Sequence, residues 1–271
     1  MSRLTAKFQA LKQARRTALI PFITAGDPNP EFTVPALHAM VKAGADILEI
    51  GVPFSDPMAD GPVIQRASER ALSHKMSLRK VLNLVSEFRQ QDTDTPIVLM
   101  GYLNPIEAMG YENFAERAGI VGVDGVLTVD LPPEESMGFL PLLEKANVDP
   151  IYLLAPNSTE ERIGKMGQLG RGYLYYVALK GVTGAANLDL ADVERKLEEI
   201  RRLTELPVAV GFGVKNAETA ASIGNVADAV VVGSALVGKI EESDGDTTLA
   251  LAGIVELLHS MRTALDASTQ S

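Results

Sequence analysis

The 271-residue sequence predicts one α/β domain over residues 1–271, a closed (β/α)8 barrel of the TIM-barrel type with an extra N-terminal helix. Eight short, β-branched and almost wholly apolar segments recur along the chain, which is typical of parallel strands covered on both faces. Amphipathic helical patterns separate these segments, and no linker or change of composition divides the chain. A doubly wound sheet would alternate in the same way, but eight strands in about 250 residues favour the closed barrel. The predicted strands are residues 19–24, 47–52, 97–102, 126–131, 151–154, 173–179, 208–212 and 229–232.

Two helices frame the predicted barrel. Leu4, Phe8 and Leu11 recur at helical spacing ahead of the first strand, so they predict an extra helix with one apolar face. A long helix follows the eighth strand. Its apolar face consists of Ile254, Leu257, Leu258, Met261 and Leu265.

Terminal signals bound several of the intervening helices. An apolar helical face over residues 34–41 ends at Gly44, where a C-terminal cap belongs. Asn104 precedes a proline and is predicted to be the N-cap of the helix after the third strand. Ser158 and Glu161 have the spacing of a capping box, which predicts a helix start at that point.

Composition excludes several classes of function. The formal net charge of −10, without a cluster of Lys and Arg, argues against a nucleic-acid partner. The absence of cysteine excludes disulfides, thiolate nucleophiles and thiolate-bound metals. Residues 1–16 carry five basic side chains and no apolar core of a signal peptide, and no stretch is long enough to span a membrane. We therefore expect a cytoplasmic protein with neither a membrane nor a nucleic acid as its partner.

Glu49 is the first candidate for catalysis because it interrupts an otherwise apolar strand end, where the active sites of such barrels lie. Burial raises the pKa of a carboxyl group, which suits a residue that gives and takes a proton near neutrality. A structural ion pair with a Lys or Arg is the alternative.

The loop over residues 52–62 is the second candidate. Three prolines and a glycine hold this segment out of a helix, so it is a shaped loop. It carries Asp56 and Asp60, either of which could be a helix cap or an exposed loop charge. Two acids after a strand-end glutamate favour an acid/base pair.

Glycines late in the chain form the third candidate. Gly211 and Gly213 lie at the end of the seventh predicted strand, and Gly233 and Ser234 follow the eighth, where barrels of this type usually bind phosphate through backbone amides. Tight turns are the alternative interpretation. The loop over residues 178–188, with Gly181 and Gly184 as hinges, could close as a lid. Neighbouring Lys180 raises the rival hypothesis of a Schiff-base aldolase, which a solvated loop position disfavours. No histidine is placed as a metal ligand, so no metal is expected.

Several motifs resemble those of the tryptophan synthase α-subunit family. The resemblance covers nearly the whole chain and is most specific between the second strand and the helix that follows it. The matching segments are residues 48–57 (LEIGVPFSDP), 59–62 (ADGP), 64–65 (IQ), 21–28 (PFITAGDP), 101–102 (GY), 104–105 (NP), 181–184 (GVTG), 211–213 (GFG) and 233–234 (GS).

The resemblance implies a carbon–carbon lyase of tryptophan biosynthesis that cleaves indole-3-glycerol phosphate to indole and glyceraldehyde 3-phosphate. It implies that Glu49 is the acid/base residue, that Asp60 stabilises charge at the indole nitrogen, and that Thr183 in the lid positions Asp60. It places Phe22, Met100, Leu127, Tyr175 and Phe212 in the indole pocket, with Met100 and Val129 at positions that vary across the family. It assigns the phosphate to Gly184, Gly213, Gly233 and Ser234.

The resemblance also implies a partner. The chain itself is expected to hold no cofactor, whereas a β subunit with pyridoxal phosphate receives the indole in an α2β2 heterotetramer. Pro53, Asp56 and Asn104 lie on segments that resemble the family's contact surface. Two alternatives remain: a stand-alone lyase with the same chemistry, and a non-catalytic ligand-binding subunit that only activates a partner.

Overall fold

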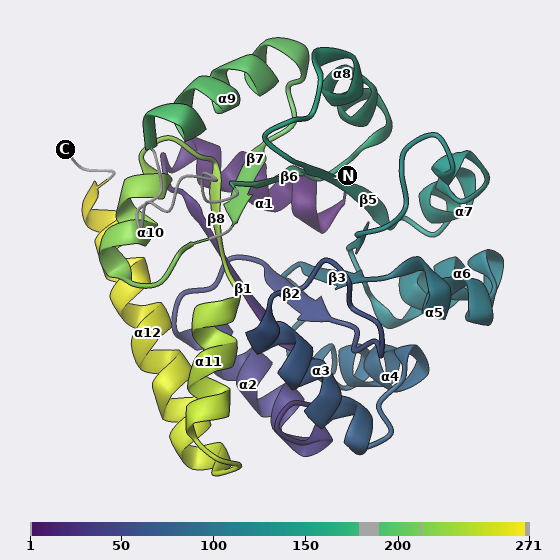
Figure 1. Ribbon diagram of the computed structural model, residues 1–271, viewed down its shortest axis with the longest axis vertical. Coiled ribbons are helices and arrows are strands. Elements are labelled where there is room, and N and C mark those ends of the chain that lie inside the picture. Colours follow the sequence, from purple (N-terminus) through teal and green to yellow (C-terminus); the bar gives the residue numbers. More distant parts are fainter. Residues whose placement is uncertain (1, 179–189, 212, 269–271) are drawn as a thin grey trace.

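The computed structural model describes residues 2–178, 190–211 and 213–268 (Figure 1). Eight parallel strands close into a barrel in the order β1 to β8, with β1 hydrogen-bonded to β8. The predicted barrel is therefore confirmed, and each predicted strand contains or overlaps an observed one. The strands are β1 (Ala18–Thr24), β2 (Leu48–Gly51), β3 (Ile97–Gly101), β4 (Gly125–Thr128), β5 (Asp149–Leu154), β6 (Leu174–Val177), β7 (Val208–Gly211) and β8 (Ala229–Val232).

Helices surround the barrel, and α11 and α12 lie side by side along one edge of the molecule (Figure 1). Apolar side chains between the strands and the helices form the larger part of the core. The helices are α1 (Arg3–Gln13), α2 (Pro30–Lys42), α3 (Pro62–Ser73), α4 (Leu78–Phe88), α5 (Leu103–Met109), α6 (Tyr111–Val121), α7 (Leu140–Lys145), α8 (Glu160–Leu169), α9 (Leu190–Leu203), α10 (Ala217–Gly224), α11 (Ser234–Glu242) and α12 (Thr247–Ser268), with a 3-10 turn η1 (Ser136–Gly138).

The predicted N-terminal helix α1 closes the N-terminal end of the barrel. Leu4, Phe8 and Leu11 are buried and pack with the inward side chains of the strands. Arg3 donates to the Asp124 carboxylate at 2.8 Å, and the Ser2 hydroxyl donates to Asp149 at 2.5 Å. Because one end of the barrel is filled in this way, a substrate can enter the interior only from the opposite end.

Gly44 ends α2 as predicted, for two physical reasons. Its φ of +107° lies in the region that favours glycine, and an added Cβ would lie 2.5 Å from Cγ of Arg262 on α12. The predicted apolar face of α12 is also confirmed. Ile254, Leu258, Met261 and Leu265 are buried in that helix, and Leu257 packs partly buried against the same core.

Two predicted helix caps were wrong. Tyr102, not Asn104, is the N-cap of α5, because the Asp130 carboxylate accepts the Leu103 amide at 2.8 Å from the neighbouring loop. Thr159, not Ser158, caps α8 through the Arg162 amide. The Ser158 hydroxyl instead accepts the Ala155 amide at 3.0 Å. Over the described ranges, no helix has the length and apolar character that crossing a membrane requires.

Candidate active site

A cavity of about 330 Å³ opens at the C-terminal ends of the strands. Side chains from β1, β2, β3, β5, β6 and β8 form its walls, together with the loops that follow β2, β4, β5, β7 and β8. Glu49 and Asp60 both line it. The structure therefore brings the two predicted carboxylates to one mostly apolar cavity.

Glu49 lies within β2, paired in register with Phe22 on β1 and Val98 on β3. Its side chain is fully buried. In the described part of the chain, no Lys or Arg pairs with it, and neither carboxylate oxygen has a well-formed hydrogen bond. Burial therefore raises the pKa of Glu49 to about 8, and the nearby Tyr173 hydroxyl offsets this only in part. This environment favours the acid/base interpretation over the structural ion pair.

Asp60 is held at the cavity by the fold of its loop. Its amide donates to the Pro57 carbonyl at 3.0 Å, and its carbonyl accepts from Gln65 on α3 at 2.8 Å. Burial raises the pKa of Asp60 to about 6, and a hydrogen bond from the Tyr102 hydroxyl offsets part of that rise. Asp56 differs, because it is exposed, does not line the cavity and accepts from its neighbour Ser55 at 2.6 Å.

The two carboxyl groups have different charge states near neutrality. With a pKa of about 8, Glu49 is mostly protonated at pH 7, whereas Asp60, with a pKa of about 6, is mostly ionised. A pair of acids whose environments separate their pKa values can combine a proton donor with a charge-stabilising anion. The cavity can therefore protonate a substrate and stabilise the cation that results.

The apolar wall of the cavity contains three of the predicted pocket residues. Phe22, Met100 and Tyr175 line it, as does Val129. Leu127 does not. It is fully buried in the barrel interior, where it packs among the inward side chains of the other strands. Phe212 lies outside the described residues.

The predicted phosphate residues lie at one end of the same cavity. Gly213, with a φ of +78°, and Gly233 and Ser234 all line it. Ser234 is the first residue of α11, and Gly233 is its N-cap. The first amides of a helix have no partner within the helix and carry partial positive charge, so this end favours an anion. Thr183, Gly184 and the rival Lys180 lie outside the described residues.

Comparison with known proteins shows the family of this chain. The sequence profile described as "Tryptophan synthase alpha chain" matches residues 8–266. The chain belongs to the tryptophan synthase alpha chain family. The chain of that name from Methylococcus capsulatus is 67% identical over 267 residues, which cover 98% of this chain and 100% of the relative. The corresponding chain from Thioalkalivibrio sulfidiphilus is 59% identical over 266 residues, with 98% and 100% covered.

Solved structures agree with this membership. The crystal structure of tryptophan synthase subunit alpha from Legionella pneumophila matches with a TM-score of 0.92 and 46% identity, and the match covers 98% of this chain and 99% of that one. Membership of the tryptophan synthase alpha chain family confirms the predicted resemblance. It also confirms the predicted lyase activity, the α reaction of tryptophan biosynthesis.

Two tyrosines next to the carboxylates were missed by the sequence analysis, namely Tyr173 beside Glu49 and Tyr102 beside Asp60. Tyr173 and Tyr175 alternate at strand period and both belong to the barrel interior, so the period could have placed Tyr173 near Glu49. Tyr102 directly follows β3, and its hydroxyl accepts the Ala59 amide at 3.0 Å.

Among the described residues of the chain, no group of three His, Asp or Glu side chains is placed to hold a metal ion.

Proposed function

We propose that Glu49 and Asp60 carry out the α reaction on indole-3-glycerol phosphate in this chain. The observation that supports this best is the placement of one fully buried and one partly buried carboxyl group on one apolar cavity that ends at glycines and a helix N-terminus. An indole ring needs an apolar wall, and a phosphate needs backbone amides. The substrate carries both groups, separated by the glycerol chain whose first carbon reacts.

The proposed reaction begins with protonated Glu49. Its proton passes to C3 of the indole, which leaves an indoleninium cation and a Glu49 carboxylate. The carboxylate then takes the proton of the hydroxyl group on the adjoining glycerol carbon. As that carbon becomes the aldehyde of glyceraldehyde 3-phosphate, its bond to C3 breaks and the electron pair neutralises the ring. Glu49 regains its proton, so the cycle balances.

Asp60 has a separate role in this proposal. Its carboxylate accepts a hydrogen bond from the indole N–H and stabilises the positive charge that develops at the nitrogen. The resemblance assigns Thr183 to the positioning of Asp60. Gly213, Gly233 and Ser234, with Gly184, bind the phosphate, and Phe22, Met100, Tyr175 and Phe212 enclose the ring. Leu127 supports this wall from within the barrel core rather than by direct contact.

Indole release from indole-3-glycerol phosphate by the purified chain tests the two carboxylates. Replacing either acid by its amide, in Glu49→Gln or Asp60→Asn, should lower turnover by at least about a hundredfold, the usual minimum both for a general acid/base group and for a group that stabilises transition-state charge. Asp56→Asn is the matched control, because Asp56 lies in the same loop but outside the cavity. Unchanged turnover in Glu49→Gln would refute the mechanism, and borohydride trapping would reveal a Schiff base at Lys180.

We further propose that the chain passes indole to a β subunit that holds pyridoxal phosphate, in an α2β2 assembly. The loop over residues 53–60 and the start of α5 form adjoining parts of the barrel's C-terminal end. The Phe54 and Tyr102 rings join them by stacking, with their centroids 5.2 Å apart. Met58 is 85% exposed in this loop, so its side chain is accessible to a partner.

The partner proposal can be tested with two matched surface variants. Met58→Lys should weaken binding to a tryptophan synthase β subunit, whereas Ile120→Lys, at a residue 77% exposed on α6, should not. The β subunit should also raise the rate of indole release at least tenfold, about 1.4 kcal/mol in the barrier. Equal turnover with and without the β subunit would support a stand-alone lyase. No turnover under either condition would support a ligand-binding subunit.

A further inference from the structure

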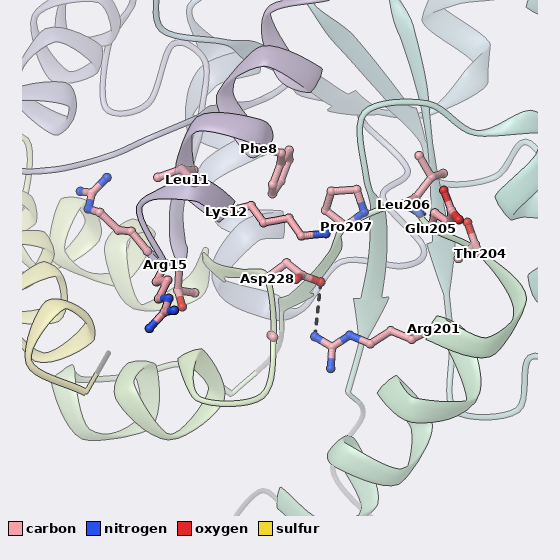
Figure 2. A pocket seen from close by; sticks show the side chains of 13 residues that line it. Phe8, Leu11, Lys12, Arg15, Arg201, Thr204, Glu205, Leu206, Pro207 and Asp228 are labelled. Carbon is pink, nitrogen blue, oxygen red and sulfur yellow. Dashed lines mark hydrogen bonds and ion pairs between the residues drawn. The ribbon is translucent and has the colours of Figure 1, made fainter. Parts of the chain in front are cut away.

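A second hollow, of about 650 Å³, lies at the N-terminal end of the barrel, opposite the catalytic cavity (Figure 2). Helix α1 and the residues that follow it form one wall, with Phe8 and Lys12 facing the hollow. The segment between α9 and β7, residues 204–207, forms another, and Asp228 before β8 completes it. The hollow thus lies where three separate parts of the chain meet.

The charge of the hollow is opposite to that of the protein. Four cationic residues line it, namely Lys12, Arg15, Arg16 and Arg201, against two acidic ones, Glu205 and Asp228. The whole chain carries a formal net charge of −10. A concave surface lined mostly by one sign of charge concentrates the opposite ion. This end of the barrel should therefore attract anions although the molecule as a whole repels them.

Two of the cations have structural partners. Arg16 pairs with Asp46 and, at 3.3 Å, with Asp266. Arg201 donates to the Val226 carbonyl at 2.8 Å and pairs with Asp228 at 3.4 Å, both through the same terminal nitrogen. The other guanidinium nitrogens of Arg201 make no hydrogen bond to the described residues. Arg201 therefore retains donors for a ligand.

Lys12 and Arg15 are the available charges. Neither side chain has an ion pair or hydrogen bond with any described residue, and both are exposed. In Figure 2 the Lys12 side chain extends across the hollow toward Pro207 and Asp228. A lysine ammonium and an arginine guanidinium on one wall, with further arginine donors on the opposite wall, form a common arrangement for binding phosphate oxygens.

Arg15 has a backbone conformation that is unfavourable for any residue other than glycine. Its φ is +50°, and its amide donates to the Lys12 carbonyl at 3.1 Å, while the Arg16 amide donates to Leu11 at 2.9 Å. This is the left-handed position after a helix, where glycine is the least strained residue. Arg15 is thus an exposed cation at the rim of the hollow, in a strained backbone conformation and with no partner among the described residues.

We propose that this hollow is a binding site for a small phosphate ester or diphosphate, separate from the catalytic phosphate position. Lys12 and Arg15 contact the phosphate oxygens from α1, and Arg201 contributes donors from the opposite side. Leu206 and Pro207 give a partly exposed apolar surface for the organic part of the ligand. Because the ligand bridges α1 to the ends of β7 and β8, its binding stabilises the closed end of the barrel.

Calorimetric titration with inorganic pyrophosphate tests the site. The titrations use the full chain carrying Ser234→Asp, which places a carboxylate at the catalytic phosphate position so that only the second hollow is measured. Lys12→Gln and Arg15→Gly should each weaken pyrophosphate binding at least tenfold. Arg15→Gly should at the same time keep or raise the Tm without ligand, because glycine relieves the left-handed backbone. Loss of binding with unchanged or higher stability separates a ligand contact from a structural role.

Lys75→Gly is the matched control. Lys75 is also an exposed cation at a left-handed position after a helix, with a φ of +57°, but it lies outside the hollow. Its substitution should leave pyrophosphate affinity unchanged. Equal weakening by Lys75→Gly, or unchanged affinity in both Lys12→Gln and Arg15→Gly, would overturn the proposal. So would equal affinity for malonate at the same ionic strength, since that result would show nonspecific attraction of anions.

Discussion

The Tyr102 hydroxyl oxygen accepts a hydrogen bond from the Ala59 amide at 3.0 Å, which ties the end of β3 to the loop that carries Asp60. The same hydroxyl donates to the Asp60 carboxylate and lowers its pKa. The pKa of Tyr102 is itself raised to about 12, first by burial, so it remains a donor at any working pH. One phenol thus fixes both the backbone and the charge beside the proposed indole nitrogen.

Tyr102→Phe should lower kcat/KM about tenfold, the cost of one hydrogen bond to a charged group, with little loss of stability. The ring stacking against Phe54 remains in the variant. In the native chain the Tyr102 hydroxyl lowers the pKa of Asp60. Its removal should therefore raise that pKa and move the acidic limb of the pH–rate profile to higher pH. Tyr111→Phe removes a hydroxyl that contacts Glu107 away from the cavity, and is the control. An unmoved acidic limb would show that Tyr102 does not act through Asp60.

The pH dependence of kcat/KM should be bell-shaped. Activity needs protonated Glu49, so the rate should fall as pH rises through about 8. It also needs ionised Asp60, so the rate should fall as pH drops through about 6. Steady-state rates of indole release across this range provide the measurement. A rate that keeps rising above pH 9 would contradict the assignment of Glu49 as the proton donor.

The free energy of unfolding should respond to Glu49 in a defined direction. Folding raises the pKa of this carboxyl from 4.5 to about 8, so the native state holds the proton more tightly than the unfolded state. The stabilisation that comes from protonated Glu49 is complete below pH 4.5 and is lost as pH rises through about 8. At about 1.4 kcal/mol per pH unit, the total loss is about 3 to 5 kcal/mol.

Urea unfolding of the native chain and of Glu49→Gln at several pH values measures this effect. The variant cannot ionise at this position, so its stability relative to the native chain should increase from pH 4.5 to about 8. The exposed Glu116→Gln should show a nearly constant difference over the same range. A constant difference for Glu49→Gln as well would mean that the carboxyl is not buried in solution.

The strands and Glu49 could be predicted from the sequence because their signals are local. An apolar run of strand length is visible in the chain itself, and a glutamate inside one stands out at once. The helix caps were less predictable. Asn104 has a suitable side chain, but the group that caps α5 is Asp130, which arrives from the loop after the next strand. Contacts of this kind form only in the closed barrel, and the residues next to Asn104 in the sequence do not indicate them.

At the candidate site, Asp56 and Asp60 show the same limit of prediction from the sequence. Asp56 and Asp60 are equivalent by composition and lie four residues apart, and only the family resemblance separated them. The folded loop separates them physically, since its turn at Pro57 directs Asp60 to the cavity and leaves Asp56 beside Ser55. Leu127 was placed in the pocket by resemblance, whereas its depth in the barrel depends on the register of β4 against β3 and β5.

Gly211 on β7 gives a prediction about the shape of the cavity. A Cβ at this position would lie 2.1 Å from the hydroxyl oxygen of Tyr175 and 2.6 Å from its Cζ atom. Tyr175 lines the cavity from β6, and its ring is enclosed by the barrel core. Gly211→Ala should therefore displace this ring into the substrate site, destabilise the protein by about 1 to 3 kcal/mol and raise KM.

Thermal unfolding and indole-release kinetics check this prediction. Gly164→Ala in α8 is the matched control, since an added Cβ there meets nothing within 4 Å, and a helical alanine should raise stability by up to about 1 kcal/mol. A second substitution, Tyr175→Leu, removes the ring atoms that collide and should restore most of the stability lost in Gly211→Ala. If Tyr175→Leu adds its own loss instead, the two residues do not compete for the same space.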